Sequence, residues 1–144
     1  MTIAVDFDGT IVEHRYPAIG KEKAFAIDTL RALSSKGHRI ILWTARDGKL
    51  LEDAIEFCRE RGLEFYAINS NYPPGALFGD SRDNPSKVVA DVYIDDRNLG
   101  GIPEWTTIYQ MILEDGEGKH RHRHHHHHHH RKKSLLQRLR EKFK

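Results

Sequence analysis

Short apolar runs alternate along the chain with longer segments in which apolar residues recur every three or four positions. The short runs are rich in β-branched and aromatic residues and end in polar residues or glycine, which predicts buried strands. Four strands are expected, over Thr2–Asp6, Arg39–Thr44, Leu63–Ile68 and the end of Val88–Ile94.

The longer segments predict three helices. Lys21–Lys36 has apolar residues at helical spacing, and Gly37 is placed to end this helix. A second helix is expected from Asp47, which can cap it, to about Arg61. A third is expected over Pro103–Leu113. Strands that alternate with helices predict an α/β fold, here a three-layer Rossmann-like domain with a mainly parallel sheet.

Length and composition fit one domain, residues 1–115, followed by a tail, residues 116–144. Of the 144 residues 38% are hydrophobic, which is enough for a packed core. No apolar run approaches the roughly 20 residues that a membrane-spanning helix needs, and no secretory signal is visible. Cys58 is the only cysteine and lies on an apolar helical face. We therefore expect a buried thiol and a reducing, cytoplasmic location.

The small net charge of +2 conceals two oppositely charged parts. From Lys119 onward the chain holds ten of its 23 basic residues, but only Glu141 among its 21 acidic residues. The preceding body therefore carries about −7 and the tail about +9, with histidines counted as neutral.

The tail contains an unbroken histidine run, His124–His130, between basic residues. Such a run can bind transition metals without fixed geometry. It can also be a purification tag, although tags seldom continue into a segment such as Arg131–Lys144. The composition favours a disordered, solvated tail. Because its last apolar residues lie at helical spacing, the alternative is a short amphipathic helix for an anionic surface, nucleic acid or the acidic body.

Acidic residues follow the first and the fourth predicted strands. Asp6-Phe7-Asp8-Gly9-Thr10 comes directly after the first, and Asp95-Asp96 after the fourth. Carboxylates at such spacing can hold a hard divalent cation, or divide the roles of nucleophile and general acid. Adjacent carboxylates repel each other unless a cation or donors are nearby. Since ligands of parallel sheets bind outside the carboxyl ends of the strands, a metal site is expected there; plain acidic turns are the alternative.

Thr44 and Lys87 complete a set of groups suited to phosphoryl transfer. Thr44 ends the second strand, where its hydroxyl can donate to a phosphoryl oxygen, and Lys87 precedes the fourth strand. Each alone is also typical of an ordinary strand end or surface residue. A carboxylate that attacks an anionic phosphoryl group needs positive charge beside it. Magnesium, Lys87 and hydroxyl donors would supply that charge.

The order of these residues resembles the haloacid dehalogenase (HAD) superfamily, in its phosphatase branch. Over roughly residues 1–113 the family's motifs appear in order, as Asp6-Phe7-Asp8-Gly9-Thr10, Thr44, Lys87 and Asp95-Asp96. The resemblance implies a Mg²⁺-dependent phosphohydrolase, a phosphomonoesterase that works through an aspartyl-phosphate. Dehalogenase members lack an acid at the position of Asp8, so phosphate chemistry is favoured.

The resemblance also implies roles for the individual residues. Asp6 is the nucleophile, and Asp8 protonates the leaving oxygen and then activates the attacking water. Thr44 and Lys87 hold the phosphoryl group. The implied Mg²⁺ ligands are Asp6, Asp8 through its main-chain carbonyl, Asp95, and Asp96 directly or through a water.

The chain has no room for a substantial cap domain, so the resemblance implies a capless member. Capless members often act on macromolecular or bulky phosphorylated substrates, or borrow a lid by oligomerising. The substrate-binding candidates are Thr10, Arg46 and Asn69. Further specificity residues are expected in a flap, Val12–Gly20, and a loop, Asn69–Pro85, at His14, Arg15, Tyr16, Asn71, Tyr72 and Arg82. Each of these, taken singly, is also an ordinary surface residue.

Alternatives come from other classes of protein. A receiver-type phosphoacceptor domain also uses acidic residues, Thr and Lys on a parallel sheet, but its acceptor Asp follows the third strand. Here nothing acidic follows Ile68 before Asp80. A catalytically idle binding module whose tail does the work is disfavoured, because the expected catalytic groups are present. Transfer of the phosphoryl group to an acceptor other than water is compatible with the same fold.

Overall fold

The structure, a computed structural model, describes residues 1–75 and 88–122, with side chains up to Asp115. The chain divides into two compact units, Met1–Ile102 and Pro103–Lys144. The first unit holds the sheet, two helices and all the described site residues.

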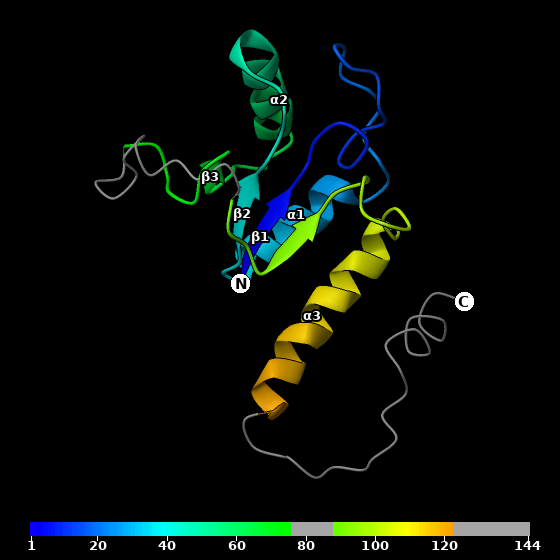
Figure 1. Cartoon of the computed structure of the whole chain (residues 1–144), viewed down its shortest axis with the longest axis vertical. Coiled ribbons are helices and arrows are strands. Elements are labelled where there is room, and N and C mark those ends of the chain that lie inside the picture. The colour runs from blue at the N-terminus through cyan, green and yellow to red at the C-terminus, as the bar shows by residue number, and fades with distance from the viewer. Residues whose placement is uncertain (76–87, 123–144) are drawn as a thin grey trace. The chain divides into compact units, whose positions relative to one another are not determined.

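Four parallel strands form one sheet in the order β3-β2-β1-β4 (Figure 1). They are β1 (Thr2–Val5), β2 (Arg39–Leu42), β3 (Ala67–Ile68) and β4 (Val92–Ile94). Val5 is paired with both Leu42 and Ile94, and Leu42 is paired with Ile68. All four strands therefore end at the same level. The predicted α/β fold with a parallel sheet is confirmed.

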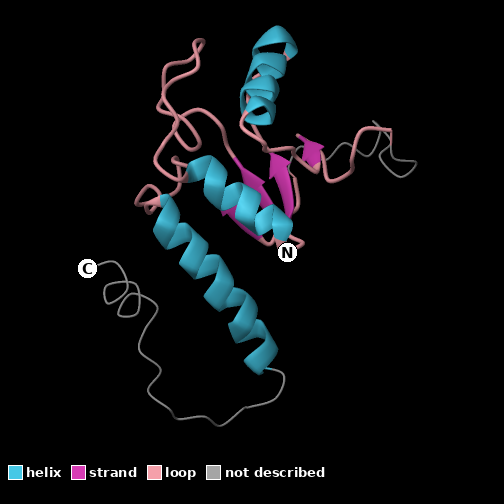
Figure 2. Ribbon diagram, turned by 180° about the vertical axis from the view of Figure 1, so that it is seen from behind, coloured by secondary structure: helices cyan, strands magenta, loops and turns pink. Residues whose placement is uncertain are grey.

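Two helices belong to the sheet unit. α1 (Ala26–Ser35) lies across one face of the sheet, as Figures 1 and 2 show from opposite sides, and buries apolar residues including Leu30 and Leu33. α2 (Gly48–Glu60) follows β2 and buries Cys58, as predicted. Burial raises the pKa of the Cys58 thiol to about 12, so this thiol is un-ionised at neutral pH. Asp47 holds the N-cap position of α2, but its side chain makes no capping hydrogen bond.

α1 begins at Ala26, five residues after the predicted start, because the preceding residues pair with the flap. Glu13 donates a backbone hydrogen bond to Lys21, and Lys23 donates one to Ile11. Residues held in this ladder cannot also take up helical geometry. The Glu22 carboxylate then accepts a hydrogen bond from the Ile27 N–H at the start of the helix.

β3 is shorter than its predicted run, and β4 takes up only the end of Val88–Ile94, as predicted. In both runs the first residue extends beyond the neighbouring strand. The pairing of Ala67 with Ile41 would place Leu63 opposite Gly37, before β2 begins. Likewise, the pairing of Val92 with Ile3 leaves Val88 beyond the start of β1. An unpaired backbone does not continue a ladder, so only the ends of the apolar runs become strands.

The second unit begins with α3 (Trp105–His122), which is longer than the predicted third helix. Trp105, Ile108 and Ile112 are buried and recur at helical spacing. The apolar pattern stops at Leu113, but no proline follows to end the helix. The helix runs through residue 115, where the sequence placed the end of the domain; that boundary stays a prediction. Among the described residues, no helix is both long and apolar enough to cross a membrane.

Candidate active site

The ends of the strands bring the predicted residues to one edge of the sheet. Backbone hydrogen bonds extend the pairing one residue further, from Asp6 to Ile94 at 3.0 Å and from Asn69 to Leu42 at 2.7 Å. Asp6, Asn69 and Asp95 each stand directly after a strand. The site is therefore built on the first residues past the strands, which the common strand end fixes in space.

Asp6, Asp95 and Asp96 form a cluster in which one carboxylate oxygen of each lies within 4.8 Å of the others. Burial raises the pKa of Asp6 to about 7; the nearby carboxylates add to the rise, and a hydrogen bond from the Phe7 backbone opposes it. Like charges at this separation are relieved by a proton or by a cation. Oxygen ligands in such number fit a hard divalent cation such as Mg²⁺, so the donor set can hold a metal.

Thr10 and Gly9, in the loop that follows β1, support this cluster. Thr10 is fully buried, and its hydroxyl accepts a hydrogen bond from the Asp96 backbone N–H at 3.0 Å. The same hydroxyl lies 3.4 Å from a carboxylate oxygen of Asp6 and of Asp96, and its single proton can serve only one at a time. Gly9 has φ +83°, and a Cβ on it would lie 2.3 Å from Asp96 Oδ2. Only glycine lets Asp96 approach this closely.

Replacing Gly9 by Ala is therefore expected to displace the Asp96 carboxylate. We expect kcat/KM for a phosphate ester to fall by about 100-fold, as a misplacement of about 1 Å in an active site can cause, with a higher Mg²⁺ requirement. Gly37→Ala is the matched control, since Gly37 has φ +90° but a Cβ there would meet nothing within 4 Å. Equal activity of the two variants would show that the close approach at Gly9 has no bearing on the site.

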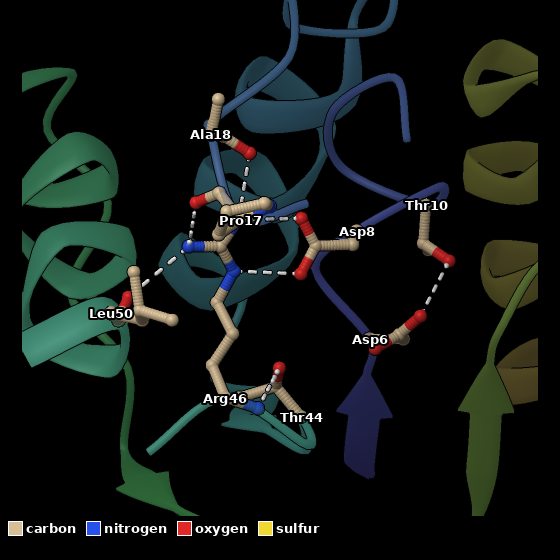
Figure 3. A network of polar contacts seen from close by, with 8 residues as sticks. All are labelled: Asp6, Asp8, Thr10, Pro17, Ala18, Thr44, Arg46 and Leu50. Carbon is tan, nitrogen blue, oxygen red and sulfur yellow. Dashed lines mark hydrogen bonds and ion pairs between the residues drawn. The ribbon is translucent and has the colours of Figure 1, made fainter. Parts of the chain in front are cut away.

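Asp8 turns away from this cluster and toward Arg46 (Figure 3). Arg46 Nε lies 2.7 Å from Asp8 Oδ2, and Arg46 Nη2 lies 2.7 Å from Asp8 Oδ1. These hydrogen bonds raise the pKa of the Arg46 guanidinium above its usual range. The Asp8 carboxylate is not part of the three-carboxylate cluster. The predicted metal contact of Asp8, through its main-chain carbonyl, stays a prediction.

Thr44 and Asn69, which follow β2 and β3, are joined by a hydrogen bond. The Thr44 backbone N–H donates to Asn69 Oδ1 at 2.8 Å, and the Thr44 hydroxyl accepts from the Arg46 backbone N–H at 3.1 Å. Asn69 thus fixes the turn that carries Thr44. Its predicted contact with substrate stays a prediction, as does that of Thr10. Lys87 and Arg82 lie outside the described residues.

An open pocket of about 540 Å³ lies at this carboxyl edge of the sheet. Its lining includes Asp6, Asp8, Asp95 and Thr44, together with His14 and Tyr16 from the flap. Trp43 and Arg97 also line it, and sequence reasoning missed both. The signal that could have found them is position, since each lies one or two residues from a predicted strand-end site residue. Arg15 does not line the pocket, and Asn71 exchanges hydrogen bonds with the Val89 backbone instead.

A parallel sheet with a carboxylate cluster at its carboxyl edge defines an α/β protein with a candidate metal-dependent active site. A model of the haloacid dehalogenase-like hydrolases matches residues 3–141. A solved structure of a conserved protein from Bacteroides thetaiotaomicron is 61% identical, covers 80% of this chain and 91% of its own, and superposes with a TM-score of 0.72. No curated protein matches the chain. The chain belongs to the haloacid dehalogenase-like hydrolase family.

Proposed function

We propose that this protein is a Mg²⁺-dependent phosphomonoesterase that forms a covalent aspartyl-phosphate on Asp6. One observation carries the proposal: carboxylates from two separate strand ends, Asp6 and the pair Asp95 and Asp96, meet beside an open pocket. A single carboxylate in a loop is an ordinary surface group. Three that converge in a partly buried site need a cation or a proton, and phosphoryl transfer is a chemistry that uses them.

In the first step, an Asp6 carboxylate oxygen attacks phosphorus. An O–P bond to Asp6 forms as the bond from phosphorus to the leaving oxygen breaks, and Asp8 gives its proton to that oxygen. Asp6 is suited to this role because β1 ends one residue before it and the hydrogen bond to Ile94 fixes its backbone. Asp8, two residues further on, also lines the pocket.

In the second step, water attacks the phosphorus of the aspartyl-phosphate. Asp8, now a carboxylate, accepts a proton from that water, and the bond from phosphorus to Asp6 breaks. Inorganic phosphate leaves, and both side chains return to their starting states. One residue therefore serves as acid and then as base, which requires that it stay in place through both steps.

The charge on the phosphoryl group needs balancing groups. When bound, Mg²⁺ would supply positive charge that stabilises the negative charge on the phosphoryl oxygens. Asp6, Asp95, Asp96 and the Asp8 carbonyl are the groups proposed to hold it. The Thr44 hydroxyl oxygen accepts a hydrogen bond from the Arg46 backbone N–H. Within the described part of the chain, the proton of this hydroxyl is therefore left to donate to the phosphoryl group. Lys87 is proposed to add a second positive charge.

The proposal extends to the capless branch of the family. Only residues 6–25 separate β1 from α1, and residues 69–91 separate β3 from β4, so neither connection is long enough for a cap of domain size. An open pocket without such a cap admits phosphates on bulky or macromolecular substrates. Mg²⁺-dependent phosphate release from sugar phosphates, nucleotides, phosphopeptides and phosphorylated nucleic acid ends tests this. Absence of release from every class, with Mg²⁺ bound, would refute the proposed function.

Deletion of Lys119–Lys144 is expected to leave hydrolysis of a small aryl phosphate within about twofold of the intact chain, because every proposed catalytic residue precedes it. The measurement is kcat/KM for p-nitrophenyl phosphate for the intact and shortened chains. If the basic tail instead recruits an anionic macromolecule, only such a substrate loses activity. A collapse of activity on the small ester would show that this segment shapes the active site.

A further inference from the structure

Arg46 is a charged side chain that is only 2% exposed, and the protein uses all five of its N–H donors. Two go to the Asp8 carboxylate, at 2.7 Å each. The other three go to main-chain carbonyls of Pro17, Ala18 and Leu50, at 2.9 to 3.3 Å. Figure 3 shows the guanidinium at the centre of this network, between the flap, α2 and the first loop.

Two aromatic rings complete the surroundings of this guanidinium. Its central carbon lies 5.2 Å from the centre of the Phe7 ring and 5.1 Å from that of the Tyr16 ring. Phe7 is buried, and its own ring packs edge-on against Phe57 of α2. Tyr16 is half exposed and lines the pocket. The position of Arg46 is thus set from several directions by groups of this chain.

This arrangement leaves Arg46 no N–H for a substrate phosphate. The planar fork of Arg46 instead holds both oxygens of Asp8 in one plane, which a point charge such as lysine cannot do.

We infer that Arg46 is a positioning residue that orients Asp8 for proton transfer and ties it to the flap, rather than a group that binds the phosphate. The inference rests on the proposed function. Loss of Arg46 should therefore impair the transfer of a proton from Asp8 to the leaving oxygen. It should leave the attack of Asp6 on phosphorus unchanged. Esters with a basic leaving group need that proton, whereas an activated aryl ester departs without it.

The test compares kcat/KM of the intact chain and Arg46→Lys on p-nitrophenyl phosphate and on a simple alkyl phosphate. kcat/KM covers the steps up to departure of the leaving group. General acid catalysis contributes about 10²- to 10⁴-fold, so we expect a loss of about 100-fold on the alkyl ester and less than about fivefold on the aryl ester. Asp8→Asn is expected to give the same selectivity, and Arg46→Lys to add little further loss in that background. Arg59→Lys, on the surface of α2, is the matched control.

Equal losses on the two esters would overturn the inference, since both a phosphate-binding role and a purely structural one give that result. Losses that add fully in the double variant would overturn it as well. If Arg46→Lys does not fold, Tyr16→Leu is measured instead, because it removes the ring that packs on the exposed side of the guanidinium. A loss of kcat/KM on the alkyl ester alone supports the inference. An equal loss on both esters overturns it. If the intact chain shows no Asp6-dependent turnover of either ester, the proposed function itself fails.

Discussion

Asp6→Asn is expected to lower turnover by roughly 10³-fold or more, because the amide oxygen is a far weaker nucleophile than the carboxylate and the covalent step is lost. The fold should persist, since the substitution keeps the size of the side chain and the backbone bond to Ile94. Circular dichroism and kcat/KM on p-nitrophenyl phosphate measure the two effects. Rapid acid quenching with a phosphate-labelled substrate should trap label on the protein only while Asp6 is present.

Asp53→Asn is the control for this substitution, because Asp53 lies on the exposed surface of α2 in an ion pair with Lys49. It should retain full activity, as surface ion pairs contribute little. Full activity of Asp6→Asn would rule out a covalent mechanism through this residue. A large loss without any trapped label in the intact chain would point to direct attack by water, with Asp6 acting only on the metal.

The meeting of the carboxylates could be predicted because it follows from strand ends. Apolar runs mark the buried strands, parallel strands share one carboxyl edge, and the polar residues at Asp6 and Asp95 come next in the chain. None of these steps depends on the shape of a loop. That is why Asp6, Asp95 and Asp96 could be placed together from sequence alone.

The partners of Asp8 and Arg46 could not be predicted in the same way. Arg46 was expected to bind substrate, but its side-chain donors reach Asp8 and the flap carbonyls of Pro17 and Ala18. Those carbonyls belong to an irregular segment, whose path is set by side-chain packing and by its pairing with residues near Lys21. Hydrophobic periodicity carries no information on such a path, so the sequence identified Arg46 as a site residue without its contacts.

Removal of divalent metal by a chelator is expected to abolish turnover and to lower the melting temperature. With Mg²⁺ at about one hundred times its dissociation constant, binding to the folded state alone contributes about 2.7 kcal/mol of stability. For a domain of this size that corresponds to a shift on the order of 10 °C. Thermal unfolding with Mg²⁺ and with chelator measures this shift, and activity should return when Mg²⁺ is restored.

The rise in melting temperature on Mg²⁺ binding should depend on pH, and the raised pKa of Asp6 sets the direction of that dependence. Its pKa is about 7 in the folded, metal-free protein against an ordinary value of 3.8. Between these values the folded state holds more protons than the unfolded state, so metal-free stability falls as pH rises from about 4 to about 7. Stabilisation by Mg²⁺ should therefore be larger near pH 8 than near pH 5. Asp6→Asn should flatten this dependence and Asp53→Asn should keep it. A melting temperature indifferent to both metal and pH would mean that the three carboxylates do not form a cation site.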